Sequence, residues 1–288
     1  MDNSTRSFRL LFQALLCGGA CCFFVCINAH AQLYVGSGGD PGVVGEYNPK
    51  TGRTINANFI TGLNYPKSLA VSGNTLLVAE EFADRVGAYD AITGEEINAN
   101  FITGLGTPTD LAISGNNLYV VYSYGSTVGL YDATTGAAIN ATLIGGGSAN
   151  LSALVILGKK LYVADPVRDT VSVYNAITGA VITKDFISLQ APFALAISAN
   201  RTLLISKPDT DSVGEYNPND GTLINANFVT GASGALARVG NYLYVGDYPS
   251  VGVYDAGTGA TINGNLVIVP GGAQCLAVRQ PHSDAPSN

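Results

Sequence analysis

The sequence has no tryptophan, a single methionine, two histidines and few charged residues. Only 12% of its 288 residues are Asp, Glu, Lys or Arg, whereas 47% are apolar. A disordered chain needs the opposite balance, and a coiled coil would be rich in Glu, Lys and Leu, so the composition excludes both. Fourteen basic against 21 acidic residues give a net charge of −7. Nucleic-acid binding is therefore disfavoured, because it needs a basic surface that neutralises phosphates.

The N-terminal segment has the features of a signal peptide and holds four of the five cysteines. Arg6 and Arg9 precede an apolar run over residues 10–29, and Ala29-His30-Ala31 supplies the small-x-small pattern of a cleavage site. We expect residues 1–31 to be removed and the mature chain to begin at Gln32. The protein would then be secreted, periplasmic or on the cell surface. An uncleaved leader that anchors the chain in a membrane is the alternative, because the run is nearly long enough to cross a bilayer.

The expected mature chain keeps one cysteine, Cys275, and one histidine, His282. A single thiol cannot form an internal disulfide, so the stability of the fold must come from burial and strand pairing. General-base catalysis near neutral pH mostly uses histidine. His282 falls in residues 280–288, which we expect to be a disordered tail. The sequence therefore offers no nucleophile with a histidine partner.

A Val-x-x-Tyr segment followed by Asp or Asn recurs six times. The copies are separated by 42, 42, 43, 42 and 38 residues and begin at Val44, Val86, Val128, Val171, Val213 and Val251. Around each copy the chain reads as four short strands with period-two alternation, separated by Gly- and Asn-containing turns. In order they are a Leu-Ala-Val type (69–71), a Leu-Tyr-Val type (33–35), the Val-x-x-Tyr segment and an Ile-Asn-Ala-Asn-Phe type (97–101). No segment has the periodicity of a helix.

Four antiparallel strands repeated every 40 to 45 residues are the pattern of a β-propeller blade. The two ends of the repeat region favour a closed ring. The chain starts on a second-type strand at 33–35 and finishes on a first-type strand at 276–278. One C-terminal strand and three N-terminal strands would then complete a shared blade. We predict an all-β, six-bladed propeller of four-stranded antiparallel blades over residues 32–279.

The units resemble the NHL/YVTN-type propeller repeats of exported bacterial proteins, through motifs such as Leu161–Asp165 and the Val-x-x-Tyr-Asp segments. The resemblance covers residues 33–278. It implies an exported repeat protein but says little about activity, because the propeller fold hosts many functions. The chain lacks the Gly-His and Trp-Asp signature of WD40 propellers.

The loops between second and third strands are the candidate binding surface, because they vary from blade to blade while the turns of the opposite face repeat. They contain nine acids, three bases and three tyrosines. The tyrosines could stack on a sugar ring while neighbouring carboxylates accept its hydroxyl protons, and the same face could bind a protein. A solvated rim of loop charges is the alternative. The predicted binding residues are Glu80, Glu81, Asp84, Arg85, Tyr122, Tyr124, Asp165, Arg168, Lys207, Asp247 and Tyr248.

These residues predict an exported, non-catalytic scaffold that binds a protein or a carbohydrate. Two other functions stay open. One is a metal-dependent hydrolase of the gluconolactonase-like propeller class, and the other is a structural surface repeat protein without a small-molecule ligand. The gluconolactonase-like enzymes hold a divalent metal with Glu, Asn and Asp. Here the blade-joining loops have no acid at the corresponding places, which are Asn64, Thr107, Asn150, Gln190 and Ser233.

No cofactor or catalytic residue is expected from the sequence. A divalent cation such as calcium is the exception left open, because Glu80, Asp165 and Asp247 occupy similar places in three blades. A calcium site needs six to eight converging oxygens, and no EF-hand-like spacing supports one here. The sequence does not fix an oligomeric state.

Overall fold

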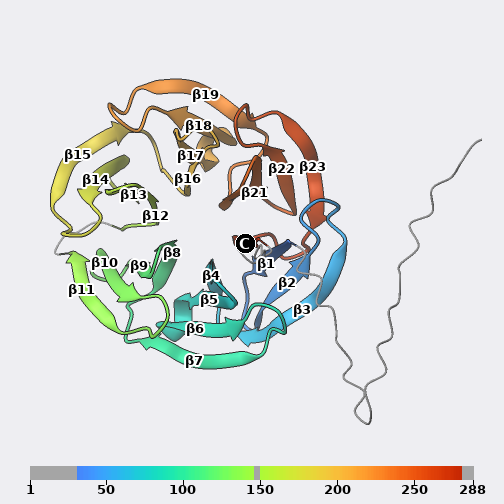
Figure 1. Ribbon diagram of the computed structural model, residues 1–288. Coiled ribbons are helices and arrows are strands. Elements are labelled where there is room, and N and C mark those ends of the chain that lie inside the picture. Colours follow the sequence, from blue (N-terminus) through green and yellow to red (C-terminus); the bar gives the residue numbers. More distant parts are fainter. Residues whose placement is uncertain (1–30, 146–149, 281–288) are drawn as a thin grey trace, which may run out of the picture.

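The computed structural model describes residues 31–145 and 150–280, which form six four-stranded antiparallel sheets around a central axis (Figure 1). This confirms the predicted six-bladed propeller. Apart from Ala31 and Gln280, the expected signal peptide and the expected tail with His282 lie outside the described residues. No helix within the described ranges is long and apolar enough to span a bilayer.

Each blade runs from an inner strand at the axis to an outer strand at the rim. Blade 1 contains β24 (Cys275–Arg279), β1 (Gln32–Ser37), β2 (Gly42–Tyr47) and β3 (Thr54–Leu63). Blade 2 contains β4 (Pro66–Ser72), β5 (Thr75–Glu80), β6 (Arg85–Asp90) and β7 (Glu96–Thr103). Blade 3 contains β8 (Pro108–Ser114), β9 (Asn117–Tyr122), β10 (Thr127–Asp132) and β11 (Ala138–Ile144).

The remaining three blades repeat this order. Blade 4 contains β12 (Ala153–Leu157), β13 (Lys160–Asp165), β14 (Thr170–Asn175) and β15 (Val181–Ser188). Blade 5 contains β16 (Leu195–Ile197), β17 (Leu203–Lys207), β18 (Ser212–Tyr216) and β19 (Leu223–Thr230). Blade 6 contains β20 (Leu236–Val239), β21 (Tyr242–Gly246), β22 (Ser250–Asp255) and β23 (Thr261–Ile268). Two 3₁₀ turns, η1 (Glu81–Ala83) and η2 (Pro208–Thr210), precede β6 and β18.

The ring is closed by pairing between the two ends of the repeat region. β24 pairs antiparallel with β1, from Gln32 opposite Arg279 to Gly36 opposite Cys275. The Arg279 guanidinium donates to Gln32 Oε1 at 2.8 Å and to Asn74 Oδ1 of blade 2 at 2.7 Å. The closing strand is therefore bonded both within its own blade and to the next one, as a ring without an open edge between its ends requires.

The repeated tyrosine of the third strand explains the glycine two residues before it. In β6 the Tyr89 ring lies against Gly87, and a Cβ at that glycine would stand 2.8 Å from Cε2 of Tyr89. A side chain at this position would displace the ring. Blade 4 has Ser172 instead, and its hydroxyl accepts the Asp185 N–H at 3.0 Å.

The tyrosine of the second strand joins neighbouring blades. Tyr119 is buried, and its hydroxyl donates at 2.9 Å to the carbonyl of Ala176, in a turn of blade 4. Three equivalent bonds join Tyr34 to Ala91, Tyr162 to Pro218 and Tyr244 to Pro49. Blades 2 and 5 carry leucine at this position, Leu77 and Leu204, which have no hydroxyl to make this bond.

The outer strands are irregular at the repeated Asn-x-Asn sequence. Asn98 Oδ1 accepts the Asn100 N–H at 3.0 Å, and the pairing of β7 with β6 shifts register at this point. The other outer strands shift register in the same way. Such bulges twist an edge strand and interrupt the row of backbone groups that another strand could pair with.

Candidate functional site

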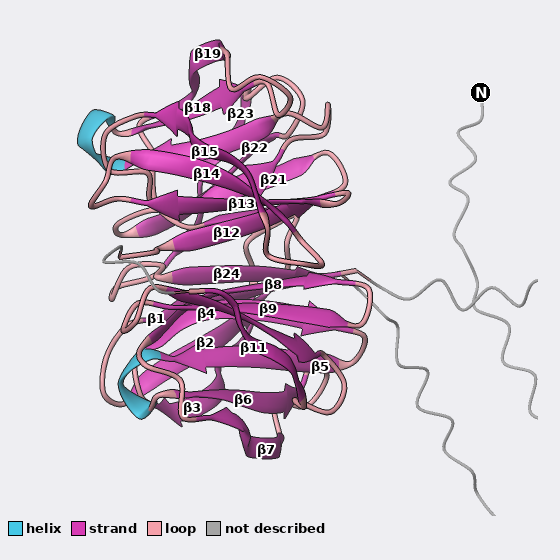
Figure 2. Cartoon of the chain, turned by 90° about the vertical axis from the view of Figure 1, so that its left-hand side faces the viewer, coloured by secondary structure: helices cyan, strands magenta, loops and turns pink. Residues whose placement is uncertain are grey.

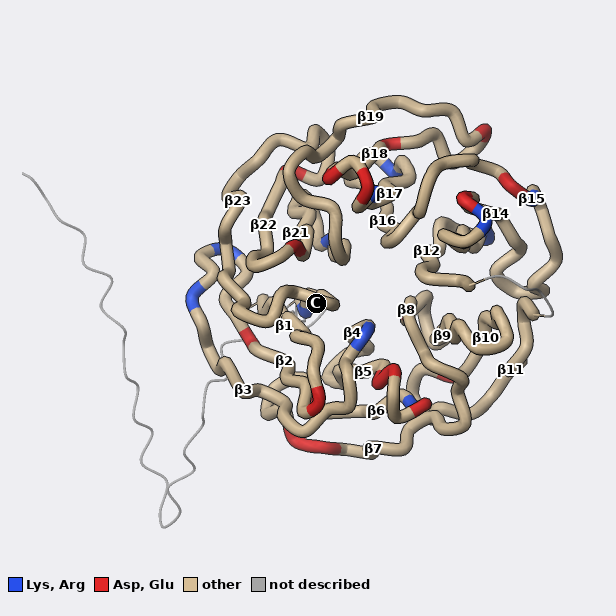
Figure 3. Tube along the Cα trace, turned by 180° about the vertical axis from the view of Figure 1, so that it is seen from behind, with Lys and Arg blue, Asp and Glu red and all other residues tan. Residues whose placement is uncertain are grey.

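The loops between second and third strands lie on one side of the ring, which we call the loop face. Figure 2 shows both 3₁₀ turns at this side. The segments that join successive blades lie there too, since the Thr107 N–H in the segment between β7 and β8 donates to Asp84 Oδ1 at 2.8 Å. Figure 3 shows the acidic and basic residues spread around the ring rather than gathered at one point.

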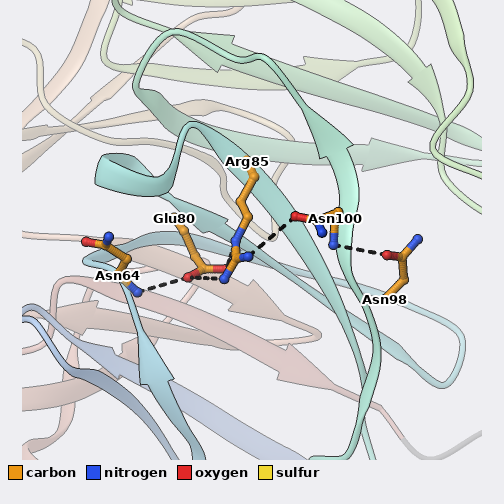
Figure 4. A network of polar contacts seen from close by, with 5 residues as sticks. All are labelled: Asn64, Glu80, Arg85, Asn98 and Asn100. Atoms are coloured by element: carbon orange, nitrogen blue, oxygen red, sulfur yellow. Dashed lines mark hydrogen bonds and ion pairs between the residues drawn. The ribbon is translucent and has the colours of Figure 1, made fainter.

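Glu80 is a structural residue at the end of β5. Its side chain is 0% exposed, and it accepts Nε and Nη2 of Arg85 at 2.8 and 3.1 Å and the Asn64 N–H at 2.9 Å (Figure 4). Arg85 also reaches Asn100 Oδ1 on the outer strand at 3.4 Å. This buried pair fastens the loop between β5 and β6 to the segment that enters blade 2, so the carboxylate does not point into solvent.

Asp165 and Arg168 repeat the arrangement within one loop of blade 4. Nη1 of Arg168 lies 2.9 Å from Asp165 Oδ2, while Asp165 Oδ1 accepts the N–H groups of Val167 and Arg168. In blade 5 the Lys207 ammonium donates to the Ala226 carbonyl at 2.7 Å, and burial lowers the pKa of this lysine. These side chains hold the shape of their own blades.

The aspartates that end the loops also have a structural role. Asp84, Asp169 and Asp211 are left-handed, with φ of 52°, 57° and 47°, a conformation that aspartate tolerates better than most residues. Asp169 Oδ1 accepts the Ala191 N–H at 2.9 Å, as Asp84 does for Thr107. Asp211 Oδ1 accepts the Ser233 hydroxyl at 3.3 Å. Three of the nine acids of the loop face thus bind the segment that leads to the next blade.

The three predicted tyrosines are in different situations. The Tyr122 hydroxyl donates to the Ala141 carbonyl on the outer strand, and burial raises the pKa of this side chain. Tyr124 and Tyr248 are 83% and 74% exposed. They belong to blades 3 and 6, which face each other across a six-bladed ring (Figure 1), so the structure does not bring them together around one sugar ring.

An aromatic group beside Glu81 was missed by the sequence analysis. Phe82 in η1 is 62% exposed, and its ring centroid lies 4.8 Å from that of Tyr65. The Lys67 ammonium lies 5.7 Å from the Tyr65 centroid and 3.8 Å from the Glu81 carboxylate. A phenylalanine in an otherwise polar loop was the signal that could have indicated this surface.

A channel of about 680 Å³ runs between the six inner strands, and Asp110 of β8 lines it. Oδ1 of Asp110 accepts the Ser68 hydroxyl at 2.8 Å and the Leu111 N–H at 2.9 Å, and Oδ2 accepts the Leu154 N–H at 2.8 Å. Burial raises the pKa of Asp110 to about 6, although these three hydrogen bonds act in the opposite direction. The carboxylate therefore ties blade 3 to blades 2 and 4 at the channel wall.

Asp110 was not among the sequence-predicted residues, although the repeat marks it. The pairing of the strands aligns it with one residue in, or directly before, each other inner strand, and all five are small: Ser68, Ala153, Ala194, Ala235 and Cys275. One acid in a ring of small residues breaks the repeat, and this departure was the signal that could have indicated Asp110.

The described residues contain no group of three His, Cys, Asp or Glu side chains placed to hold a metal ion. Glu80 and Asp165, two of the three carboxylates considered for calcium, are each paired with an arginine. Cys275 is a buried free thiol on β24, and burial raises its pKa to about 12.

Comparison with known proteins supports the fold. No protein-family model and no curated protein sequence matches the chain. The similar solved structures include a nidogen/laminin complex, with a TM-score of 0.69, and a protein of unknown function from Bacteroides caccae, with a TM-score of 0.66. Each is 16% identical in sequence, over 86% of this chain and 98% of the other chain. At this identity the likeness shows a shared β-propeller fold.

Proposed function

We propose that the protein is an exported, non-catalytic scaffold of the NHL/YVTN type that binds another protein through its loop face. The observation that carries the proposal is a set of large apolar side chains exposed there on four blades: Phe82, Tyr124, Val167 and Tyr248, each 62 to 83% exposed. None of them belongs to a buried core cluster of the blades. Exposed aromatic groups with a polar surround are typical of interaction surfaces.

The charges of the loop face support a protein partner more than a polar small ligand. Glu80, Asp84, Asp165 and Lys207 are already bonded within the fold, so few carboxylates are free to accept sugar hydroxyls. Glu81 and Asp247 remain near the exposed aromatics as polar groups at the edge of the surface. The similarity to a propeller taken from a nidogen/laminin complex agrees with a protein partner. A carbohydrate bound at Tyr124 or Tyr248 alone is the narrower alternative.

Affinity capture with two matched variants tests this proposal. The loop-face variant carries Phe82→Ser, Tyr124→Ser and Tyr248→Ser. The control variant replaces three comparably exposed isoleucines of the outer strands with serine: Ile97, Ile139 and Ile262. We expect one envelope or extracellular protein to bind the mature chain and the control, and its purified form to bind the loop-face variant at least ten-fold more weakly.

Three outcomes would contradict the proposal. Equal binding by the loop-face variant would place the partner elsewhere, and capture of nothing would favour the structural repeat protein. Turnover of lactones or esters that depends on added calcium or zinc would favour the hydrolase. Circular dichroism of both variants confirms that each is folded.

A further inference from the structure

The central channel is lined by apolar residues of the inner strands and by a few polar side chains, among them Asp110. Asp110 lies on blade 3, and blade 6 faces it across the axis with Ala235, while Phe193 and Ala194 of blade 5 add further apolar surface. The residues level with Asp110 are small, which leaves room beside its carboxylate. A pocket of a few hundred cubic ångströms with apolar walls and one fixed polar group is the usual form of a small-molecule site.

The Asp110 carboxylate has no cationic partner. No ion pair in residues 31–145 and 150–280 includes it. The two basic residues that line the channel are engaged elsewhere, since Lys67 lies 3.8 Å from Glu81 and Nη1 of Arg238 donates to the Gly240 carbonyl at 2.6 Å. The channel near Asp110 therefore carries a negative charge that no basic side chain balances.

The hydrogen-bond geometry of Asp110 leaves one acceptor position open. A carboxylate has about four lone-pair sites. Oδ1 uses two of them for Ser68 and Leu111, and Oδ2 uses one for Leu154. The remaining site on Oδ2 can take a single further donor, and a positively charged donor would also balance the charge.

We propose that the channel beside Asp110 binds a small molecule that carries a primary ammonium group on an apolar body. The ammonium donates to Oδ2 of Asp110, and the apolar body lies against Phe193, Ala194 and Ala235. This site is distinct from the loop-face surface, and neither proposal depends on the other.

Ligand-observed NMR with simple amines and their neutral counterparts tests the site. The probes are benzylamine and n-butylamine, with benzyl alcohol and 1-butanol as controls for apolar binding. We expect the mature protein at pH 7.5 to bind each amine at least ten-fold more tightly than the matching alcohol. Asp110→Asn should lose this preference, and Asp84→Asn, which removes an acid of the loop face, should keep it.

A second variant keeps the test valid if Asp110→Asn does not fold. Asp110→Ser introduces the residue that blade 2 has at this position, so the fold should accept it, and it should also lose the preference for amines. Equal binding of amines and alcohols, unchanged amine binding in both Asp110 variants, or no binding of either amine would each overturn the proposal. The Phe82, Tyr124 and Tyr248 triple variant should bind the amines normally, which separates this result from failure of the loop-face proposal.

Discussion

Replacing Arg85 should destabilise the fold more than replacing its partner Glu80. In Arg85→Ala the Glu80 carboxylate, 0% exposed, would keep only the Asn64 N–H as a partner. Unpairing a buried charge costs about 3 to 5 kcal/mol. The Arg85 side chain is 26% exposed, so water can partly replace it, and we expect about 3 kcal/mol. For a protein of this size that lowers the melting temperature by roughly 6 to 12 °C.

Glu80→Gln should be milder, because the partly exposed guanidinium can turn towards solvent. Losing a charge-assisted hydrogen bond costs about 1.5 to 3 kcal/mol, and we expect the lower end. The double variant should be close to Glu80→Gln alone, which gives a coupling free energy of about 3 kcal/mol, the full cost of Arg85→Ala. Without tryptophan in the chain, urea unfolding at pH 7 can be followed by tyrosine fluorescence and far-ultraviolet circular dichroism.

A control and a clear contrary result complete the test. Arg53→Ala removes an exposed arginine of the opposite face and should change the free energy of unfolding by less than about 0.5 kcal/mol. If Arg85→Ala matched this control, or if the two single changes were simply additive, Glu80 and Arg85 would belong to a solvated rim of charges. The reasoning from burial would then be refuted.

Two further predictions concern the contacts between blades. Tyr119→Phe removes the hydrogen bond to the Ala176 carbonyl and leaves that acceptor unpaired. The substitution should therefore lower the free energy of unfolding by about 1 kcal/mol. An unchanged midpoint of urea unfolding would show that this hydrogen bond contributes nothing to stability. The pKa of Asp110 in the folded protein is about 6, above the ordinary value of an aspartate, so ionisation of this carboxyl opposes folding. The stability that protonated Asp110 contributes is therefore lost as the pH rises from about 4 to above 6. The free energy of unfolding of the wild type minus that of Asp110→Asn, measured by urea unfolding, should fall by up to about 3 kcal/mol over this range. A difference that stays constant with pH would contradict the shifted pKa.

The blade architecture was predictable because its determinants are close together in the sequence. Alternation with period two marks each strand, and the spacing near 42 residues marks each blade. Closure followed from an incomplete strand set at each end, and the pairing of Gln32 with Arg279 confirms it. Even the glycine of the third strand has a local cause, since Tyr89 covers Gly87 only two residues away.

The roles of the loop acids were not predictable in this way. Variation between blades suggested residues free to bind a ligand, yet Glu80 differs from its counterparts because it pairs with Arg85 and Asn64. Asp165 likewise has its own arginine. A charged residue at a variable position can serve a local structural need as well as a ligand, and only its surroundings in space distinguish the two.

The sequence alone determined the number of blades, their strand order and the way the ring closes, because backbone pairing and apolar alternation repeat along the chain. Only the tertiary structure decided which side chains remain available for binding. It buried Glu80, left Phe82 in solvent, and placed Asp110 in a channel formed by six inner strands distant in sequence. Burial and charge balance arise from neighbours in space, and no spacing along the chain records them.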